Sequence, residues 1–194
     1  KTKIDKITIN NADVTVYALF KKDITIKVVY LNKQQEAVEK IFNATMYNND
    51  EGVKVKTQTA WAEASISVPH GYRFLKIGTT GEQEIVCNDS TTLKAFYNKV
   101  VTLTTMLNNE ELDTIPCNML FKINDNNKLE LLEKATYNLN KPYIKAGEGK
   151  FIGWAYKTQE NEFVLLEDQN VLVFDTDTII HALVEAQSDF SGLI

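Results

Sequence analysis

Long apolar runs are missing from this sequence of 194 residues. A helix that crosses a bilayer needs about 20 mainly apolar residues in succession. The longest apolar runs here span only a few residues, so no transmembrane helix is expected. No signal peptide is recognisable at the N-terminus. The chain starts at Lys1 rather than at Met, which indicates a fragment or a processed protein, so the missing signal says little about localisation.

Positive charge is scarce and dispersed. The chain has 21 Lys and Arg against 26 Asp and Glu, a formal net charge of −5, and Arg73 is its single arginine. Binding to a phosphate backbone requires basic side chains clustered on one surface, whereas Lys21 and Lys22 are the only adjacent pair. We therefore expect neither nucleic acid nor a membrane as a main partner. The abundance of Lys, Asn and Ile is typical of AT-rich coding DNA and indicates a low-GC bacterium or a virus of one.

Cysteine and histidine are too few for a metal site or a disulfide framework. Cys87 and Cys117 do not form a CxxC pair, and His70 and His181 lie far apart in the sequence. Structural zinc sites use four such ligands at short spacings. We expect two free, partly buried thiols, with a disulfide between them as the alternative.

Catalytic and phosphate-binding motifs are also missing. The segment 147–150, Gly-Glu-Gly-Lys, ends like a phosphate-binding loop, but it lacks the early glycine and is followed by Phe151 instead of Ser or Thr. Asp175 and Asp177 carry oxygen ligands that suit calcium, but the spacing of an EF-hand is absent. No GxSxG, GxGxxG or HExxH sequence occurs. We therefore expect no cofactor, no metal and no catalytic residue, and hence no enzyme.

Segments rich in β-branched and aromatic residues dominate the chain, and their partial alternation is typical of half-buried strands. We expect strands at Ile4–Ile9, Asp13–Phe20 and Ile24–Leu31. Short turns between further segments of this kind predict three β-hairpins. These hairpins pair Tyr72–Ile77 with Glu84–Cys87, Met119–Ile123 with Lys128–Leu132, and Phe151–Tyr156 with Glu162–Leu166. A short helix through Lys128–Tyr137 is the alternative for the second hairpin, because Leu129, Leu132 and Ala135 are spaced by three.

One segment has the signals of a helix. Asn32 can act as an N-cap, and Gln35 stands three residues later in the spacing of a capping box. Apolar residues then recur at helical intervals up to Thr45. This pattern predicts a helix from about Asn32 to Met46.

The chain also repeats itself. Asp13–Phe20, Ser90–Tyr97 and Asp177–Val184 each have a polar start, a threonine or threonine pair, an apolar residue two before a shared alanine, and two apolar residues after it. The shared alanines are Ala18, Ala95 and Ala182. Upstream of the last two, Phe74 corresponds to Phe151. Ala95 follows Phe74 by 21 residues and Ala182 follows Phe151 by 31, and we expect the ten additional residues to form a loop.

Residues 71–77 align with residues 149–154 if one residue is gapped, and each segment follows a proline. With the hairpin and the closing strand that carries the alanine, they resemble the Listeria–Bacteroides repeat, a small β-grasp-like module of bacterial surface proteins whose pattern is Gly-x-x-Phe-x-Gly-Trp. The better copy runs from Lys150 to Ala182, whereas Lys76 and Ile77 replace the Gly-Trp of the family in the first copy. Asp13–Phe20 corresponds to a closing strand alone. The resemblance implies extracellular display, carries no catalytic residues, and implies a structural core. That core comprises Phe74, Ala95, Phe151, Trp154 and Ala182.

We therefore predict a β-rich α+β fold of two tandem β-grasp-like modules with one clear helix near residues 32–46. The first module spans residues 1–100 and includes added N-terminal strands. The second spans residues 101–194, ends in an irregular tail, and meets the first near Tyr97–Leu107. An unpaired N-terminal strand would be an open edge through which copies of the chain could associate.

The predicted function is that of a non-enzymatic structural or binding protein on a bacterial cell surface or a virion, acting in adhesion or assembly through protein surfaces. A phage virion protein, such as a capsid decoration or head-fibre protein, is the first alternative. A glycan-binding module or a small enzyme with an unrecognised site is the second. Trp61 is the best candidate for a ligand contact if its side chain is exposed.

Overall fold

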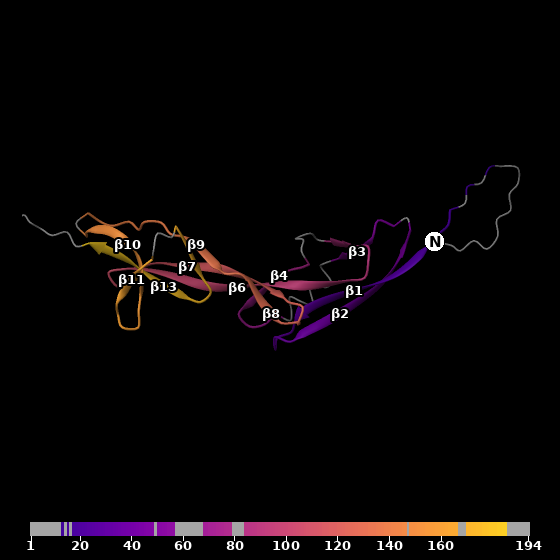
Figure 1. Ribbon diagram of the computed structural model, residues 1–194, viewed down its shortest axis with the longest axis horizontal. Helices are drawn as coiled ribbons and strands as arrows, with labels where there is room; N and C mark the ends of the chain where they lie inside the picture. The colour runs from indigo at the N-terminus through magenta and orange to yellow at the C-terminus, as the bar shows by residue number, and fades with distance from the viewer. Residues whose placement is uncertain are drawn as a thin grey trace, which may run out of the picture.

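The computed structural model describes residues 13, 15, 17–48, 50–56, 68–78, 84–146, 148–166 and 170–185. Within these residues the chain consists of strands, turns and irregular segments without a helix, so the predicted α+β class with two β-grasp-like modules and one clear helix is wrong. Nine strands form one mixed sheet, and β3–β5 and β9–β12 form two small antiparallel sheets in an elongated molecule (Figure 1). The strands are β1 (Lys21–Leu31), β2 (Ala37–Tyr47), β3 (Val53–Lys56), β4 (Tyr72–Ile77), β5 (Glu84–Cys87), β6 (Thr91–Leu107), β7 (Glu110–Ile123), β8 (Leu129–Glu133), β9 (Ala135–Asn138), β10 (Lys150–Lys157), β11 (Phe163–Leu165), β12 (Val171–Phe174) and β13 (Thr178–Glu185).

The segment predicted as a helix is a hairpin turn followed by strand β2. The side-chain Oδ1 of Asn32 accepts hydrogen bonds from the backbone N–H groups of Gln34 and Glu36, which builds a turn instead of a helix cap. Strand β2 then pairs with β1 over its whole length in antiparallel register. The prediction failed because asparagine favours both helix caps and turns, and because the pairing with β1 outweighed the helical spacing of the apolar residues.

Strand β6 connects the two halves of the molecule. Thr91–Lys94 pair in parallel with β1, and Leu103–Leu107 pair in parallel with β13. Ala95–Lys99 pair antiparallel with β4, and Phe96–Leu107 pair antiparallel with β7. The expected boundary near Tyr97–Leu107 therefore falls inside one unbroken strand that both halves share.

The parallel pairing occurs twice in the same arrangement. Ile26 of β1 lies opposite Thr91 of β6, and Leu103 of β6 lies opposite Thr178 of β13. Strand β6 therefore pairs with β13 in the second half of the molecule as β1 pairs with β6 in the first half. We call β1–β5 with the first part of β6 the first unit, and the second part of β6 with β7–β13 the second unit.

The antiparallel pairing on the other side of β6 and of β13 is repeated as well, with β4 beside β6 and β10 beside β13. Strand β4 has a register shift between Phe74 and Lys76, and β10 has one between Phe151 and Gly153. Such a β-bulge bends the strand and re-aims the side chains that come after it. The residues after the two bulges pair in the same way, Ile77 with Ala95 and Trp154 with Ala182. The small sheets also correspond, with Val53 opposite Cys87 and Ala135 opposite Phe174.

The remaining predictions on strands have mixed outcomes. Hairpins β7–β8 and β10–β11 are confirmed, so the alternative helix through Lys128–Tyr137 is wrong. The predicted hairpin of β4 and β5 is wrong, because β4 pairs with β6 and β5 with β3. The residues described between 13 and 20 lie outside any strand, whereas Ile4–Ile9 and the tail 187–194 lie outside the described residues. The additional residues of the second unit do not form a plain loop, since the segment between β10 and β12 contains β11.

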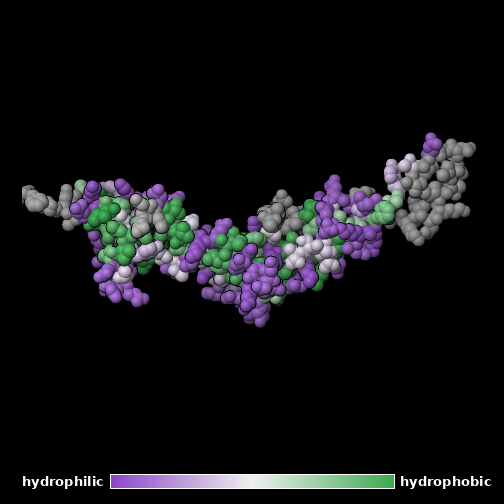
Figure 2. Space-filling model, viewed as in Figure 1, coloured by the Kyte–Doolittle hydropathy of each residue, from purple (hydrophilic) through white to green (hydrophobic). Residues whose placement is uncertain are grey.

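Apolar side chains gather separately in the two units. One buried cluster lies in the second unit and includes Leu103, Trp154 and Ile180. Two others lie mainly in the first unit, one around Tyr97 and the other around Ile26. Figure 2 shows apolar surface at the end formed by β10, β11 and β13 and again over the middle of the molecule.

Candidate functional site

The place of β13 between β6 and β10 has strict side-chain requirements, and we call it the closing position of the second unit. Ile180 and Ala182 point into the core and are 0% and 5% exposed, whereas Ile179 is 55% exposed. Trp154 of β10 lies opposite Ala182 in the same core cluster, and its indole N–H donates to the carbonyl of Asn140 at 3.0 Å. A large side chain at Ala182 would therefore collide with a packed and hydrogen-bonded indole.

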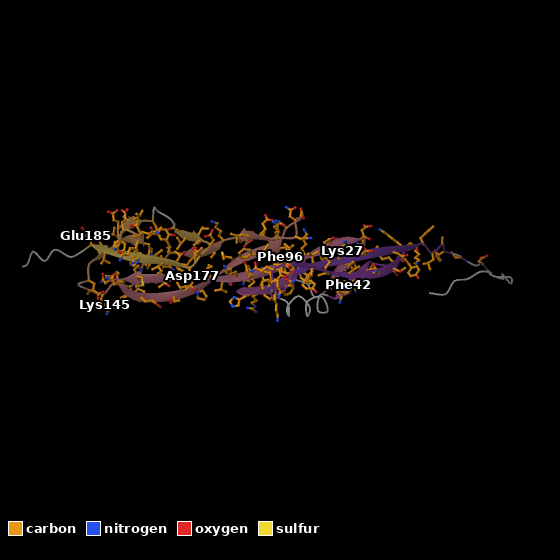
Figure 3. All side chains as sticks on the ribbon, turned by 90° about the horizontal axis from the view of Figure 1, so that it is seen from below. Lys27, Phe42, Phe96, Lys145, Asp177 and Glu185 are labelled. Atoms are coloured by element: carbon orange, nitrogen blue, oxygen red, sulfur yellow. The ribbon has the colours of Figure 1, made fainter. Side chains whose placement is uncertain are left out.

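A side-chain cap marks the start of the closing position. The backbone N–H of Thr102 donates to Oδ1 of Asp177 at 2.8 Å. From Asp177, β13 runs outward to Glu185 at one end of the described molecule (Figure 3). Strand β13 is the last strand of the described residues, and it pairs with β6 on one side and with β10 on the other.

The first unit has the same closing position, and the first part of β6 fills it. The backbone N–H of Thr25 donates to Oγ of Ser90 at 2.9 Å, and Ala95 is fully buried. Tyr97 is also fully buried, and its hydroxyl accepts the backbone N–H of Leu31 at 2.7 Å. Burial raises the pKa of Tyr97 to about 12, because the charged phenolate would lose its hydration.

The chain carries a third segment of this kind before β1. Tyr17, Leu19 and Phe20 are 84%, 50% and 69% exposed. The backbone of this segment is held by Asn48, which exchanges hydrogen bonds with Phe20 and donates from its side-chain amide to the carbonyl of Ala18 at 3.0 Å. The side chains of Tyr17, Leu19 and Phe20 therefore face solvent in the isolated chain.

A groove of about 420 Å³ lies in the second unit between the β6–β7 turn and the segment that precedes β10. Tyr143 is 84% exposed at its wall, and Tyr137 and Trp154 also line it. Four carboxylates and two lysines complete much of its polar lining, namely Glu110, Glu111, Asp113, Glu148, Lys141 and Lys145. The arrangement offers an aromatic surface beside hydrogen-bonding groups, with carboxylates in excess.

The residues predicted as a structural core all lie in or against apolar clusters. Phe74 and Ala95 belong to a cluster of the first unit, Trp154 and Ala182 belong to that of the second, and Phe151 packs against the latter. Phe151 and Trp154 contact each other edge to face with ring centroids 5.8 Å apart. The predicted contact residue Trp61 lies outside the described residues.

The cysteine and histidine side chains of the described residues do not form a reactive cluster with one another or a metal-binding group. Cys87 and Cys117 are free and buried, and burial raises the pKa of both thiols. His181 contacts the ring of Phe163 at 5.1 Å, and burial together with Lys157 lowers its pKa. Among the described residues, no three His, Cys, Asp or Glu side chains are grouped to hold a metal ion. The described part of the chain also contains no helix long and apolar enough to cross a bilayer.

The sequence pattern did not reveal the partners of the closing segments. Ser90 and Asp177 stand out in the sequence only as polar starts, but each caps a threonine on the strand beside it. An alignment of Ile24-Thr25-Ile26 with Val101-Thr102-Leu103 is the signal that would have revealed both caps. Tyr143 was missed because an aromatic residue in an irregular segment has no periodicity to mark it.

Comparisons of the chain with protein-family models, with curated proteins and with solved structures found no match in any of the three.

Proposed function

We propose that this chain is a non-enzymatic structural protein made of two tandem all-β units, displayed on an extracellular surface, where it acts in assembly or adhesion. The observation that carries the proposal is strand β6, which fills the closing position of the first unit and then pairs with β7 and β13 in the second. A shared strand couples the two units more tightly than a flexible linker would.

The course of the strands supports a mechanical role. Strands β1, β6 and β13 overlap in parallel in succession along the elongated molecule (Figure 1). A force applied along this axis would load the hydrogen bonds of each overlap together rather than one after another. Such an arrangement suits a stalk or a fibre, in which mechanical continuity matters more than a reactive site.

The location of the protein in its native source tests this proposal. An antibody against the chain should label intact cells or purified virus particles without permeabilisation. Labelling of particles would favour the virion form of the proposal, and labelling of cells the cell-surface form. Recovery of the protein from the cell interior alone would contradict both.

A second candidate function is glycan binding, which is favoured by the groove around Tyr143. The exposed aromatic side chain next to carboxylates and amide groups suits a sugar ring, which needs an apolar contact and several hydrogen bonds. The excess of carboxylates favours uncharged sugars over acidic ones. Titration of the chain with uncharged and acidic oligosaccharides tests this function, and equal or absent binding of the two classes would contradict it.

A further inference from the structure

We propose that Asp13–Phe20 is a spare closing strand that enters the closing position of a second copy of the chain, in place of β13, and so joins copies head to tail. The inference deepens the proposed assembly function and rests on it. It names the donor segment, the acceptor position and the residues that decide the fit.

The donor segment matches β13 residue by residue. Asp13 corresponds to Asp177, and the following residues align without a gap up to Phe20, which corresponds to Val184. Leu19 corresponds to Leu183, so three positions are identical when the shared alanine is included. Asp13 would then bring a carboxylate to the backbone N–H of Thr102, as Asp177 does.

The alternation of the segment also fits the acceptor. The inward positions of β13, including the fully buried Ile180, correspond to Val16, Ala18 and Phe20, which are all apolar or small. The outward position of Ile179, which is 55% exposed, corresponds to the polar residue Thr15. The donor segment therefore has the side chains that a closing strand needs on each face.

The continuation of the segment into β1 matches the rest of the fold. Strand β6 has 17 residues because its first part closes one unit and its second part continues into the next. Strand β1 has 11 residues, and the donor segment leads directly into it. Insertion of the segment would lengthen β1 in the manner of β6, so that the junction between copies repeats the junction within one chain.

The donor segment and the closing position lie at opposite ends of the molecule, so the exchange can continue from copy to copy. The donor segment precedes β1 at one end, whereas β13 and its closing position lie toward the opposite end (Figure 1). Each exchange places one closing strand in the core and leaves one outside, so the number of filled positions does not change. Such strand exchange is a low-cost route to oligomers, and a head-to-tail geometry generates chains rather than closed dimers.

Two arginine substitutions within the donor segment test the inference. Ala18→Arg would place a charged side chain next to Trp154 after insertion, whereas Thr15→Arg would place it on the outward face. Both residues are exposed in the isolated chain, so neither substitution should change its fold. The full chain is partly unfolded in mild denaturant at high concentration, returned to buffer and analysed by size-exclusion chromatography with light scattering. We expect a ladder of oligomers for the wild type and for Thr15→Arg, and at least a tenfold lower oligomer fraction for Ala18→Arg.

A variant of the acceptor completes the test. Ala182→Arg should expel β13 and leave the closing position empty, so that oligomers form without prior unfolding. Adding Ala18→Arg to this variant should return it to a monomer. Oligomers that persist in the double variant, or a monomeric Ala182→Arg protein, would overturn the inference. The surface location of the protein would be unaffected by that result, so failure of strand exchange and failure of the proposed function can be told apart.

Discussion

The carboxylate of Asp177 accepts the backbone N–H of Thr102 at 2.8 Å, although the two residues lie 75 positions apart in the chain. Ser90 makes the same contact with Thr25 at 2.9 Å in the first unit. Different side chains thus perform one task at two corresponding places. The contact sets the register at which a closing strand begins, because it lies just before the first parallel pair in each unit.

We predict that the cap is interchangeable between the two units. We expect Asp177→Ala to lower the free energy of unfolding by about 1 kcal/mol, since a hydrogen bond to the Thr102 N–H is lost. Asp177→Ser should recover more than half of that loss, because Ser90 shows that a hydroxyl can reach the corresponding group. Urea denaturation of the three proteins measures the difference. A serine variant as unstable as the alanine variant would mean that the charge, rather than the cap, stabilises the junction.

Substitutions at two glycines with a positive φ can distinguish the cost of backbone strain from the cost of a steric clash. Gly149 has φ +107°, and a Cβ there would lie 2.2 Å from the carbonyl oxygen of Glu185, whereas Gly71 has φ +82° and open space around it. We expect Gly71→Ala to cost about 1 kcal/mol through strain alone, and Gly149→Ala to cost at least about 3 kcal/mol because β13 must also move. Thermal denaturation of both variants gives the comparison. Equal losses of stability in the two variants would show that the backbone at the end of β13 can move away from the new Cβ at little cost.

Tyr97 should stabilise the first unit through its hydroxyl group. Tyr97→Phe leaves the buried N–H of Leu31 without its partner at 2.7 Å, so we expect a loss of about 1–3 kcal/mol in urea denaturation. The same substitution should change the response to alkali. In the wild type the pKa of Tyr97 is raised from 10 to about 12, so the folded state holds this proton more tightly than the unfolded state.

The sign of that effect is a loss of stability with rising pH. The contribution of Tyr97 is complete below pH 10 and is lost progressively as the pH rises from 10 through about 12. Denaturation curves collected across this range should therefore fall more steeply for the wild type than for Tyr97→Phe. Parallel curves would contradict the assignment of this proton to Tyr97.

Tyr143 decides whether the groove binds a sugar. Its side chain is 84% exposed, so Tyr143→Ala should leave the thermal stability nearly unchanged. If the groove binds uncharged oligosaccharides, the same substitution should weaken that binding about tenfold, the scale of one aromatic contact. Tyr17→Ala, an equally exposed tyrosine outside the groove, is the matched control for calorimetric titration. Equal affinities of the two variants would exclude Tyr143 as a contact.

Some elements could be predicted from the sequence alone, because polar side chains in their turns bond to the nearby backbone. The turns at Asn124–Asn127 and Thr158–Asn161 carry polar residues that bond their own backbone, and the two hairpins around them were predicted correctly. The turn that begins at Asn32 uses the same chemistry, yet its sequence predicts the start of a helix. The difference lies in the residues after the turn, because only pairing with β1 distinguishes a strand from a helix over Ala37–Tyr47.

The candidate site was readable only in part. The matching segments around Ala18, Ala95 and Ala182 were evident in the sequence, since they share a local pattern. Their partners were not evident, because Thr25 and Thr102 lie 65 and 75 residues from the side chains that cap them. The groove was invisible for the same reason, as its walls come from segments brought together by folding.

The sequence by itself therefore determined the strand-rich character of the chain, the turns of the β7–β8 and β10–β11 hairpins and the recurrence of an alanine-centred segment, because each depends on neighbours along the chain. Tertiary structure alone decided that β4 pairs with β6 rather than with β5, and that one strand serves two units. The physical reason is that the backbone N–H and C=O groups of a strand can pair with a strand on either side, so they do not by themselves select the partner strand. The choice falls to the packing of distant apolar faces, which here places Ile77 and Trp154 against the two alanines.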